Sequence, residues 1–487
     1  MNNIIAKNTL YSRTINVLLQ ELHRSNISYC HWKSNEHLQA AMCGDTDLDM
    51  LFKFQDFDTL TKLFNKCGFQ LYEVPKYRRY PHIYDFISID PVSNKIIHLH
   101  AHFRLIIGKS GIKNYHLDIE PEILNNRMYN DEMKVYYCSP FLELYLLLIR
   151  LGLKYEPILW KENKGQKDLE NFKREFNWLI ERVGHDKFEV QLNSLSKEVV
   201  NIYHKIREEG FEHKHLLSLS HTVKAKLKDK RLIKNFLLLS LLLKQFQFQY
   251  SRVKRKLDVG FLPKRRVNAS KGIIIALLGS DGSGKSTQII QLRKSMSPKI
   301  DVDTFYMGSN KGSRSKFRSV LEVFKGKFLK NKNLVQKIVN LLIVFAIAFE
   351  KRMRMKKASL IKKSGGFVIC DRYPQTKIFG YNDGPLMFKA YSNTENIFLK
   401  LLLKLEHNCY SGKGLEKPDL VFKLIANPDT LIARRNMSLD DVNRKQDGIK
   451  ILDYPESKVF TIDADKSIEQ VTSQILNHIK IEYFNKI

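Results

Sequence analysis

A glycine-rich run that contains one lysine and several hydroxyl residues has the composition needed to hold a phosphate chain. It reads Gly279-Ser280-Asp281-Gly282-Ser283-Gly284-Lys285-Ser286-Thr287 and satisfies G-x-x-x-x-G-K-[ST], the pattern of a phosphate-binding loop (P-loop). Glycines let the backbone wrap an anion, and free N–H groups of the loop and of the following helix point at it. The pattern predicts that Lys285 places its charge on the β- and γ-phosphates and that Ser286 offers its hydroxyl to Mg²⁺.

The segments around this run predict the elements that must position it. Ile273–Leu278 is short, apolar and rich in β-branched residues, as in a buried parallel strand, and Gln288–Arg293 begins a helix. We expect further strands at 302–307, 367–370, 419–424 and 459–463, a long helix over Leu334–Lys362 and a last helix capped by Ser467. Alternating strands and helices predict an α/β fold, a P-loop parallel sheet flanked by helices, with phosphates at its carboxyl edge.

A second group of residues that could take part in catalysis or metal binding lies in the N-terminal half. Gly44–Asp49 places a small-residue turn before two aspartates that are separated by one apolar residue. On a strand this spacing puts Asp47 and Asp49 on one face, where two carboxylates can hold a pair of Mg²⁺ ions. Residues 97–105 carry three alternating histidines, which can bind zinc, but the sequence indicates no fourth ligand.

Length and charge limit the class of protein. The 487 residues predict at least two domains, and 43% hydrophobic residues suffice for globular cores. The formal net charge of +30 favours anionic partners such as nucleotides, nucleic acid, acidic glycans or a phospholipid surface, although AT-rich coding also favours lysine. We expect an α+β part at 1–138, a helical region at 139–255, a basic linker at 256–270 and the P-loop domain at 271–487.

Cysteine usage and the N-terminus predict a cytoplasmic protein. None of the six cysteines forms a C-x-x-C pair, and no apolar signal segment follows Met1. No apolar run approaches the ~20 residues of a membrane-spanning helix. Phe236–Leu243 and Ile338–Phe349 are short and flanked by Lys or Arg, so we interpret them as buried helices and leave open a peripheral contact with the inner membrane face.

Four segments in order give residues 271–487 a resemblance to the thymidylate kinase family of P-loop kinases. They are the P-loop, Val368–Tyr373, Pro418–Leu424 followed by Pro428-Asp429, and Ile462-Asp463-Ala464. The resemblance implies ATP and Mg²⁺ as cofactors, with Mg²⁺ held through Ser286 and Asp371 and Arg372 at the transferring phosphoryl group.

The same resemblance assigns further residues to the acceptor and to a mobile lid. Asp281 matches an acidic P-loop position that contacts the acceptor in the family, and Arg434–Lys445 matches the lid. Lid arginines neutralise phosphate charge on closure; Arg435 is our first candidate, with Arg434 and Arg444 as alternatives.

On the acceptor side the sequence departs from the family. The family's Arg-Glu-Pro-Gly stretch is replaced by Tyr306–Asn310, and its Phe-Ala-Ala-Asp-Arg by Phe345–Phe349, with Glu350, Lys351 and Arg352 displaced by one turn. Bidentate arginines carry such recognition, so we expect a kinase that does not favour thymidine monophosphate.

The aspartate pair and its turn resemble the nucleotidyltransferase superfold. Residues 97–105 resemble the strand that supplies that superfold's third carboxylate, but His98 or His100 stands at this place. Three interpretations stay open: an active transferase, a degenerate nucleotide- or glycan-binding module, and an unrelated α/β domain.

The leading functional hypothesis is an ATP-dependent phosphotransferase that acts on a nucleotide, sugar or glycan-precursor acceptor. The basic stretch Arg314–Lys337 suits a polyanionic or lipid-linked acceptor. One alternative is a nucleotidyltransferase that works through Asp47 and Asp49. The other is an ATP-binding protein associated with nucleic acid or acting as a sensor, which the charge permits although the chain shows no known RNA or DNA module.

Overall fold

The computed structural model divides the chain into two compact units. Unit 1 is Met1–Leu262 with Phe484–Ile487, and unit 2 is Pro263–Tyr483. The structure describes residues 11–109, 112–155, 163–183, 197–233, 265–309, 315–328, 334–380, 382–388, 393–435 and 437–485, with one or two residues at a time between 239 and 263. Most of the predicted linker, 256–262 and 264, and part of the basic stretch, 314 and 329–333, therefore lie outside the described residues. The finer division at 138, 255 and 270 stays a prediction.

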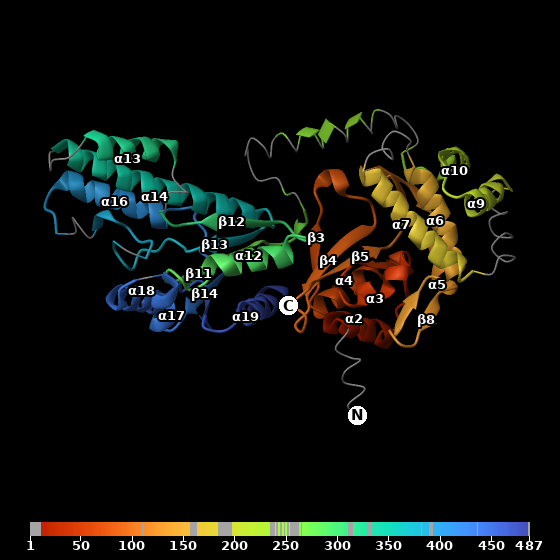
Figure 1. The fold of residues 1–487 in the computed structure, drawn as a ribbon, viewed down its shortest axis with the longest axis horizontal. Helices are drawn as coiled ribbons and strands as arrows, with labels where there is room; N and C mark the ends of the chain where they lie inside the picture. The colour runs from red at the N-terminus through yellow and green to blue at the C-terminus, as the bar shows by residue number, and fades with distance from the viewer. Residues whose placement is uncertain are drawn as a thin grey trace, which may run out of the picture. The chain divides into compact units, whose positions relative to one another are not determined.

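Unit 2 is built on a five-stranded parallel sheet, which confirms the predicted α/β fold class (Figure 1). The strands, in sheet order, are β12 (Val302–Tyr306), β13 (Phe367–Asp371), β11 (Ile273–Gly279), β14 (Leu420–Ile425) and β15 (Lys458–Asp463). A short strand, β10 (Val267–Asn268), precedes them in the chain. The central strand β11 is buried at every position, as its apolar sequence predicts for a sheet covered on both faces.

Helices cover both faces of this sheet. They are α12 (Lys285–Met296), α13 (Lys316–Phe328), α14 (Leu334–Lys363), α16 (Ile397–Ser411), α17 (Pro428–Arg435), α18 (Leu439–Ile451) and α19 (Ile468–Ile479). In Figure 1, α13, α14 and α16 lie together along one side, and α17, α18 and α19 lie along the other. The predicted long helix is present, and Ser467 caps α19 in a capping box with Gln470, because each side chain bonds the other residue's backbone N–H.

Unit 1 contains a mixed sheet in the order β3-β4-β5-β2-β1-β9-β8 and a separate hairpin of β6 and β7. The strands are β1 (Tyr29–His31), β2 (Leu48–Phe52), β3 (Gln70–Glu73), β4 (Ile83–Ile89), β5 (Ile96–His102), β6 (Leu105–Lys109), β7 (Ile112–Leu117), β8 (Met128–Asn130) and β9 (Val135–Tyr137). Strand β5 runs parallel to β2 and antiparallel to β4, which places Asp49 and Asp85 on either side of His100.

Two apolar cores hold unit 1 together. One packs the sheet against α2 (Arg13–Arg24), α3 (Leu38–Met42) and α4 (Phe57–Lys66). The other is shared by the later helices, α5 (Glu120–Asn125), α6 (Pro140–Lys154), α7 (Asn163–Ile180), α9 (Lys197–Glu209) and α10 (His213–Lys226). Helix α6 is buried along most of its length and supplies many residues of this second core.

All six cysteines are free thiols. Among the described residues, no helix is both long and apolar enough to cross a bilayer. Ile338–Phe349 lies inside α14 as a helix, but the prediction that it is buried is wrong for Ile338, Leu342 and Phe349, which are exposed. Most of Phe236–Leu243 lies outside the described part of the chain.

The turn after α14 depends on Gly365. Its φ is +79°, and a Cβ at this position would lie 2.0 Å from the carbonyl oxygen of Asn268. We predict that Gly365→Ala lowers the free energy of unfolding by more than about 2 kcal/mol, because steric conflict adds to the backbone strain. At Gly414, with φ +83° and no atom within 4 Å, alanine should cost only the strain, about 1 kcal/mol. Equal melting temperatures for the two variants in calorimetry would contradict the role of the Asn268 contact.

Candidate functional site

The P-loop lies between the end of β11 and the start of α12, where the sequence predicts it. Gly282 and Gly284 have φ values of +88° and +84°, which residues with a side chain rarely adopt. Gly284 directly precedes Lys285, so the unpaired N–H groups of the first helical turn open onto the loop. A Cβ on Gly279 would lie 2.3 Å from Ser283 Oγ, which shows how closely the loop folds on itself.

Lys285 is buried at the base of this loop. Its Nζ donates a hydrogen bond of 2.7 Å to the carbonyl oxygen of Ser280. Burial and the nearby charge of Arg372 lower the pKa of Lys285 to about 8, although Asp371 and Asp281 oppose that shift. The ammonium group therefore sits in a site where an added anion would stabilise its charge.

Asp371 and Ser286 meet at the carboxyl edge of the sheet. Asp371 ends β13, which pairs in parallel with β11 and aligns Asp371 with Leu277, so both chain segments reach the same edge. Ser286 Oγ donates to Asp371 Oδ2 at 3.2 Å, and the buried Oδ1 of Asp371 has no hydrogen-bond partner in the described structure. Burial raises the pKa of Asp371, partly offset by Lys285 and Arg372.

Arg372 is positioned next to the P-loop by its backbone conformation and by two ion pairs. Its φ of +68° is strained for a residue with a side chain, and its backbone N–H donates to Leu277 at 2.9 Å. Its guanidinium group pairs with Asp281 at 2.5 Å and with Asp383 at 3.6 Å. Asp281 also pairs with Lys445 Nζ at 2.9 Å, so these four side chains form a continuous chain of alternating charge.

Two of the three predicted lid arginines lie next to the P-loop. Arg434 Nη1 donates to the carbonyl oxygen of Gly282 at 3.2 Å. A Cβ on Gly282 would lie 3.2 Å from Arg435 Cγ, so this arginine is also next to the loop. Arg444 instead pairs with Asp441 at 2.6 Å within α18. Arg434 makes the hydrogen bond to the loop, while the role that we predict for Arg435 stays a prediction.

Sequence reasoning missed Asp383 and named Lys351 only as part of the displaced stretch on the acceptor side. Lys351 is 2% exposed in α14, and its Nζ pairs with Asp383 Oδ1 at 3.1 Å. Asp383 joins this lysine to Arg372 and so extends the charge chain toward the acceptor side. The only sequence signal was the turn pattern Asn382-Asp383-Gly384, which gave no indication of function. The carboxylate of the displaced Glu350 accepts hydrogen bonds from Arg318 at 3.2 Å and from Ser315 N at 2.7 Å, so both contacts give it a structural role.

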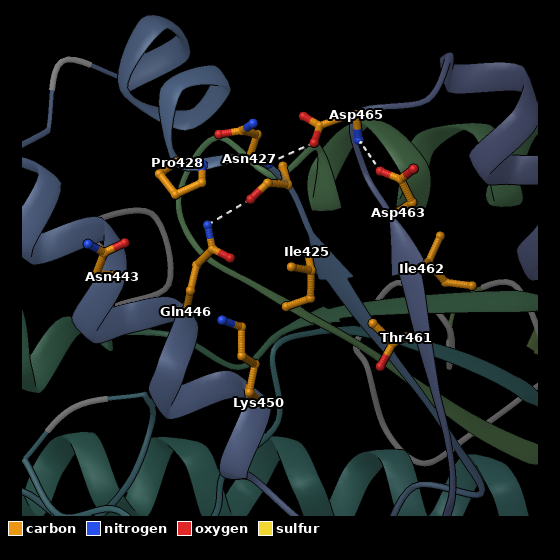
Figure 2. A pocket seen from close by; sticks show the side chains of 11 residues that line it. Ile425, Asn427, Pro428, Asn443, Gln446, Lys450, Thr461, Ile462, Asp463 and Asp465 are labelled. Carbon is orange, nitrogen blue, oxygen red and sulfur yellow. Dashed lines mark hydrogen bonds between the residues drawn. The ribbon is translucent and has the colours of Figure 1, made fainter.

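A cavity of about 610 Å³ opens at the carboxyl ends of β14 and β15 (Figure 2). Gln446 Nε2 donates to the carbonyl oxygen of Ala426 at 2.8 Å, and Asp465 accepts from the backbone N–H of Asn427 at 2.7 Å. Because β14 pairs with β11 and aligns Leu424 with Gly279, the cavity lies along the same sheet edge as the P-loop. Its lining is Ile425, Ala426, Asn427, Pro428, Asn443, Gln446, Lys450, Thr461, Ile462, Asp463 and Asp465.

Comparisons with known proteins relate under half of the chain to ATP-binding proteins. No family model matches. The uncharacterized ATP-binding protein YghS of Escherichia coli K12 is 24% identical over 226 residues, 44% of this chain and 94% of that protein. The uncharacterized ATP-binding protein YghR of the same strain is 26% identical over 216 residues, 41% of this chain and 84% of that protein. 

The comparisons also include thymidylate kinases. That of Prochlorococcus marinus MIT 9312 is 28% identical over 222 residues, 42% of this chain and 94% of that protein. A solved structure of thymidylate kinase from Candida albicans is 19% identical, covers 45% of this chain and 96% of its own, and has a TM-score of 0.30. Part of the chain is therefore similar to ATP-binding proteins and to a thymidylate kinase, at a distant level.

In unit 1 each of the two predicted aspartates forms an ion pair with a histidine of β5. Asp47 directly precedes β2 and pairs with His98 Nδ1 at 2.9 Å, whereas Asp49 lies within β2 and pairs with His100 Nδ1 at 2.7 Å. His98 Nε2 also pairs with Asp85 at 2.6 Å. Asp85 is a carboxylate that the sequence did not reveal, because it lies on β4 and reaches the site only through strand pairing.

Asp49 is held in its ionised form. Burial raises the pKa of Asp49, but Lys33 and hydrogen bonds from His100 and His102 outweigh this and keep it well below the usual range. Lys33 Nζ lies 2.9 Å from Asp49 Oδ1. The N-terminal site thus contains a buried carboxylate surrounded by nitrogen groups.

Proposed function

We propose that unit 2 is an ATP-dependent phosphotransferase that acts on a nucleotide, sugar or glycan-precursor acceptor and does not favour thymidine monophosphate. The observation that carries this proposal is the convergence of Lys285, Ser286 and Asp371 at one edge of a parallel sheet, directly at a P-loop. The similarity of part of the chain to ATP-binding proteins and a thymidylate kinase supports it.

Ser286 and Asp371 are the residues that would hold Mg²⁺. Both offer oxygen donors, which Mg²⁺ prefers, and the buried Asp371 Oδ1 has no hydrogen-bond partner in the described structure. When bound there, the ion would neutralise charge on the β- and γ-phosphates. The other predicted Mg²⁺ ligands, Asp47 and Asp49, belong to unit 1.

The protein groups around the loop would stabilise charge on the phosphoryl group in transfer. Backbone N–H groups of 279–287 and the ammonium of Lys285 would bind the β- and γ-phosphates. Arg372 is already oriented at the loop by Asp281 and Asp383, and Arg434 and Arg435 lie over Gly282. Preorganised cations of this kind lower the barrier because they need no rearrangement as charge develops.

The cavity beside β14 and β15 is our candidate site for the nucleotide base. It lies along the P-loop edge and combines apolar walls with amide side chains, which suit a planar base. We predict that Asn443→Trp, which fills it, weakens ATP binding by about tenfold while tripolyphosphate, which has no base, binds as before. Asp440→Trp changes the same helix outside the cavity and serves as the control in calorimetry. Equal loss of affinity for both ligands would contradict the assignment.

The pH dependence of ATP binding should reveal Lys285. Since its pKa is lowered to about 8 in the free protein, and bound phosphate would raise it, binding above pH 8 must take up a proton. ATP affinity is therefore expected to be constant below about pH 8 and to fall as the pH rises above it. Calorimetry in buffers of different ionisation enthalpy measures the proton uptake. In Lys285→Met the uptake should vanish; if it persists unchanged, another group is responsible.

The experiment that tests the proposed activity is an acceptor screen. Purified chain with Mg²⁺ and γ-labelled ATP is incubated with nucleoside monophosphates, sugars or glycan extracts, and label in the acceptor is measured. We expect labelling of at least one acceptor and little labelling of thymidine monophosphate. Slow ATP hydrolysis without any labelled acceptor would favour the sensing or nucleic-acid-associated alternative instead.

Nucleotidyl transfer in unit 1 is the second candidate function. Asp85 favours it, because this carboxylate reaches the His98 position where the sequence indicated no acidic residue. The two activities differ in their products: nucleotidyl transfer releases pyrophosphate and is sensitive to Asp47→Asn with Asp49→Asn, whereas phosphoryl transfer releases ADP and is sensitive to changes at Lys285.

A further inference from the structure

Three donor atoms from two neighbouring strands of unit 1 face one point. Asp49 Oδ1 lies 2.7 Å from His100 Nδ1 and 3.6 Å from His102 Nε2, and these two ring nitrogens lie 3.2 Å apart. Strand pairing produces the group, because β2 and β5 run in parallel with Asp49 aligned to His100, and His102 follows on the same face. We call these three residues the Asp49–His100–His102 group.

The three donor atoms lie close enough together to bind one metal ion after small side-chain adjustments. Two ligands at about 2.0–2.1 Å from a tetrahedral ion lie roughly 3.3 Å apart. The three separations, 2.7, 3.2 and 3.6 Å, bracket that value. The neighbouring His98 shows the contrasting arrangement, since its two nitrogens point to two different carboxylates, Asp47 at 2.9 Å and Asp85 at 2.6 Å, as in an ordinary hydrogen-bonded histidine.

The Asp49–His100–His102 group offers two nitrogen donors and one carboxylate, so it suits zinc better than the Mg²⁺ that the sequence predicts at Asp49. Mg²⁺ prefers oxygen ligands and retains water, whereas imidazole nitrogens favour zinc and similar ions. Here each aspartate contacts a histidine, and Asp49 contacts two of them. The donor set is thus one carboxylate and two imidazoles.

We propose that Asp49, His100 and His102 bind one zinc-class divalent transition-metal ion and leave at least one coordination position open. Three protein ligands with an open position are the arrangement of catalytic rather than structural zinc sites. This proposal is independent of the phosphotransferase activity, because all three ligands lie in unit 1.

Charged side chains around the Asp49–His100–His102 group both favour and oppose the binding of a cation. Asp47 and Asp85 add negative charge through their contacts with His98. Lys33 Nζ forms an ion pair with Asp49 Oδ1 at 2.9 Å, so a cation that binds this carboxylate must displace the ammonium group. Removing this ammonium should therefore favour the metal, whereas a purely structural Lys33–Asp49 pair predicts no such gain.

The test is Zn²⁺ and Mg²⁺ titration of the full chain in calorimetry, with Co²⁺ absorption as a spectroscopic readout. We expect one Zn²⁺ per chain, bound far more tightly than Mg²⁺, and Co²⁺ ligand-field bands in the visible range. His100→Gln with His102→Gln should weaken Zn²⁺ binding by more than about 100-fold. His215→Gln is the matched control, because this histidine lies in a separate cluster of possible metal ligands with Glu209 and Glu212.

Lys33→Met keeps the test decisive if the histidine variant does not fold. It leaves all three ligands in place, and we expect it to bind Zn²⁺ more tightly than the unchanged chain. Weaker Zn²⁺ binding by Lys33→Met, loss of binding in His215→Gln, or Zn²⁺ affinity no greater than that for Mg²⁺ would each overturn the proposal.

Discussion

Lys285→Ala is expected to lower phosphoryl transfer from ATP by at least about 100-fold, the loss typical when one preorganised electrostatic group is removed. The reason is the position of the ammonium group, which is buried beneath the P-loop and donates a hydrogen bond of 2.7 Å to the Ser280 carbonyl oxygen. Alanine would leave the backbone N–H groups to hold the phosphates without a nearby full charge. ATP affinity and the transfer rate should fall together, because the lysine contacts bound and transferring phosphates alike.

The measurement is label transfer from γ-labelled ATP to the acceptor found in the screen, with ATP affinity from calorimetry. Lys294→Ala is the matched control: it makes the same change in the same helix at an exposed position. Because burial penalises the charge of Lys285, its removal should not lower the melting temperature. Transfer at the unchanged rate in Lys285→Ala would refute the proposed mechanism.

Asp371→Asn is the second large effect that we expect, a loss of about 100-fold or more in Mg²⁺-dependent transfer. Burial raises the pKa of Asp371, so its charged form costs stability in the ligand-free protein at neutral pH. Asparagine keeps the shape and removes that cost. The variant should thus unfold at the same or a higher temperature while transfer is lost, which separates a functional role from a structural one.

Asp419→Asn provides the opposite control. Asp419 lies at the other end of the sheet, where it pairs with Lys362 at 2.8 Å and accepts from the N–H of Ile274 at 2.8 Å. This variant should unfold at a lower temperature and keep its transfer rate per folded molecule. Mg²⁺ titration of the transfer rate measures the first effect and calorimetry the second. An Asp371→Asn protein that is less stable and still fully active would contradict both expectations.

The sequence alone determined the phosphate-binding end of unit 2. The P-loop is a contiguous pattern, so its glycines, Lys285 and Ser286 follow from local rules of conformation and charge. Asp371 was also predictable, because parallel strands bring their carboxyl ends to one edge whatever their order in the sheet. The strands of this sheet and the cap of the last helix likewise follow from local apolar periodicity and capping chemistry.

Tertiary structure alone decided which charges meet across that edge and which meet in unit 1. Asp383 reaches Arg372 and Lys351 from a loop whose path depends on packing, and Lys445 reaches Asp281 from a separate helix. The Asp49–His100–His102 group exists only because β2 pairs with β5 in one register; a slip of one residue would turn these side chains to opposite faces. The local sequence pattern indicates which residues share a strand face. The partner and register of each strand depend instead on the packing of the whole core, to which residues distant in the sequence contribute.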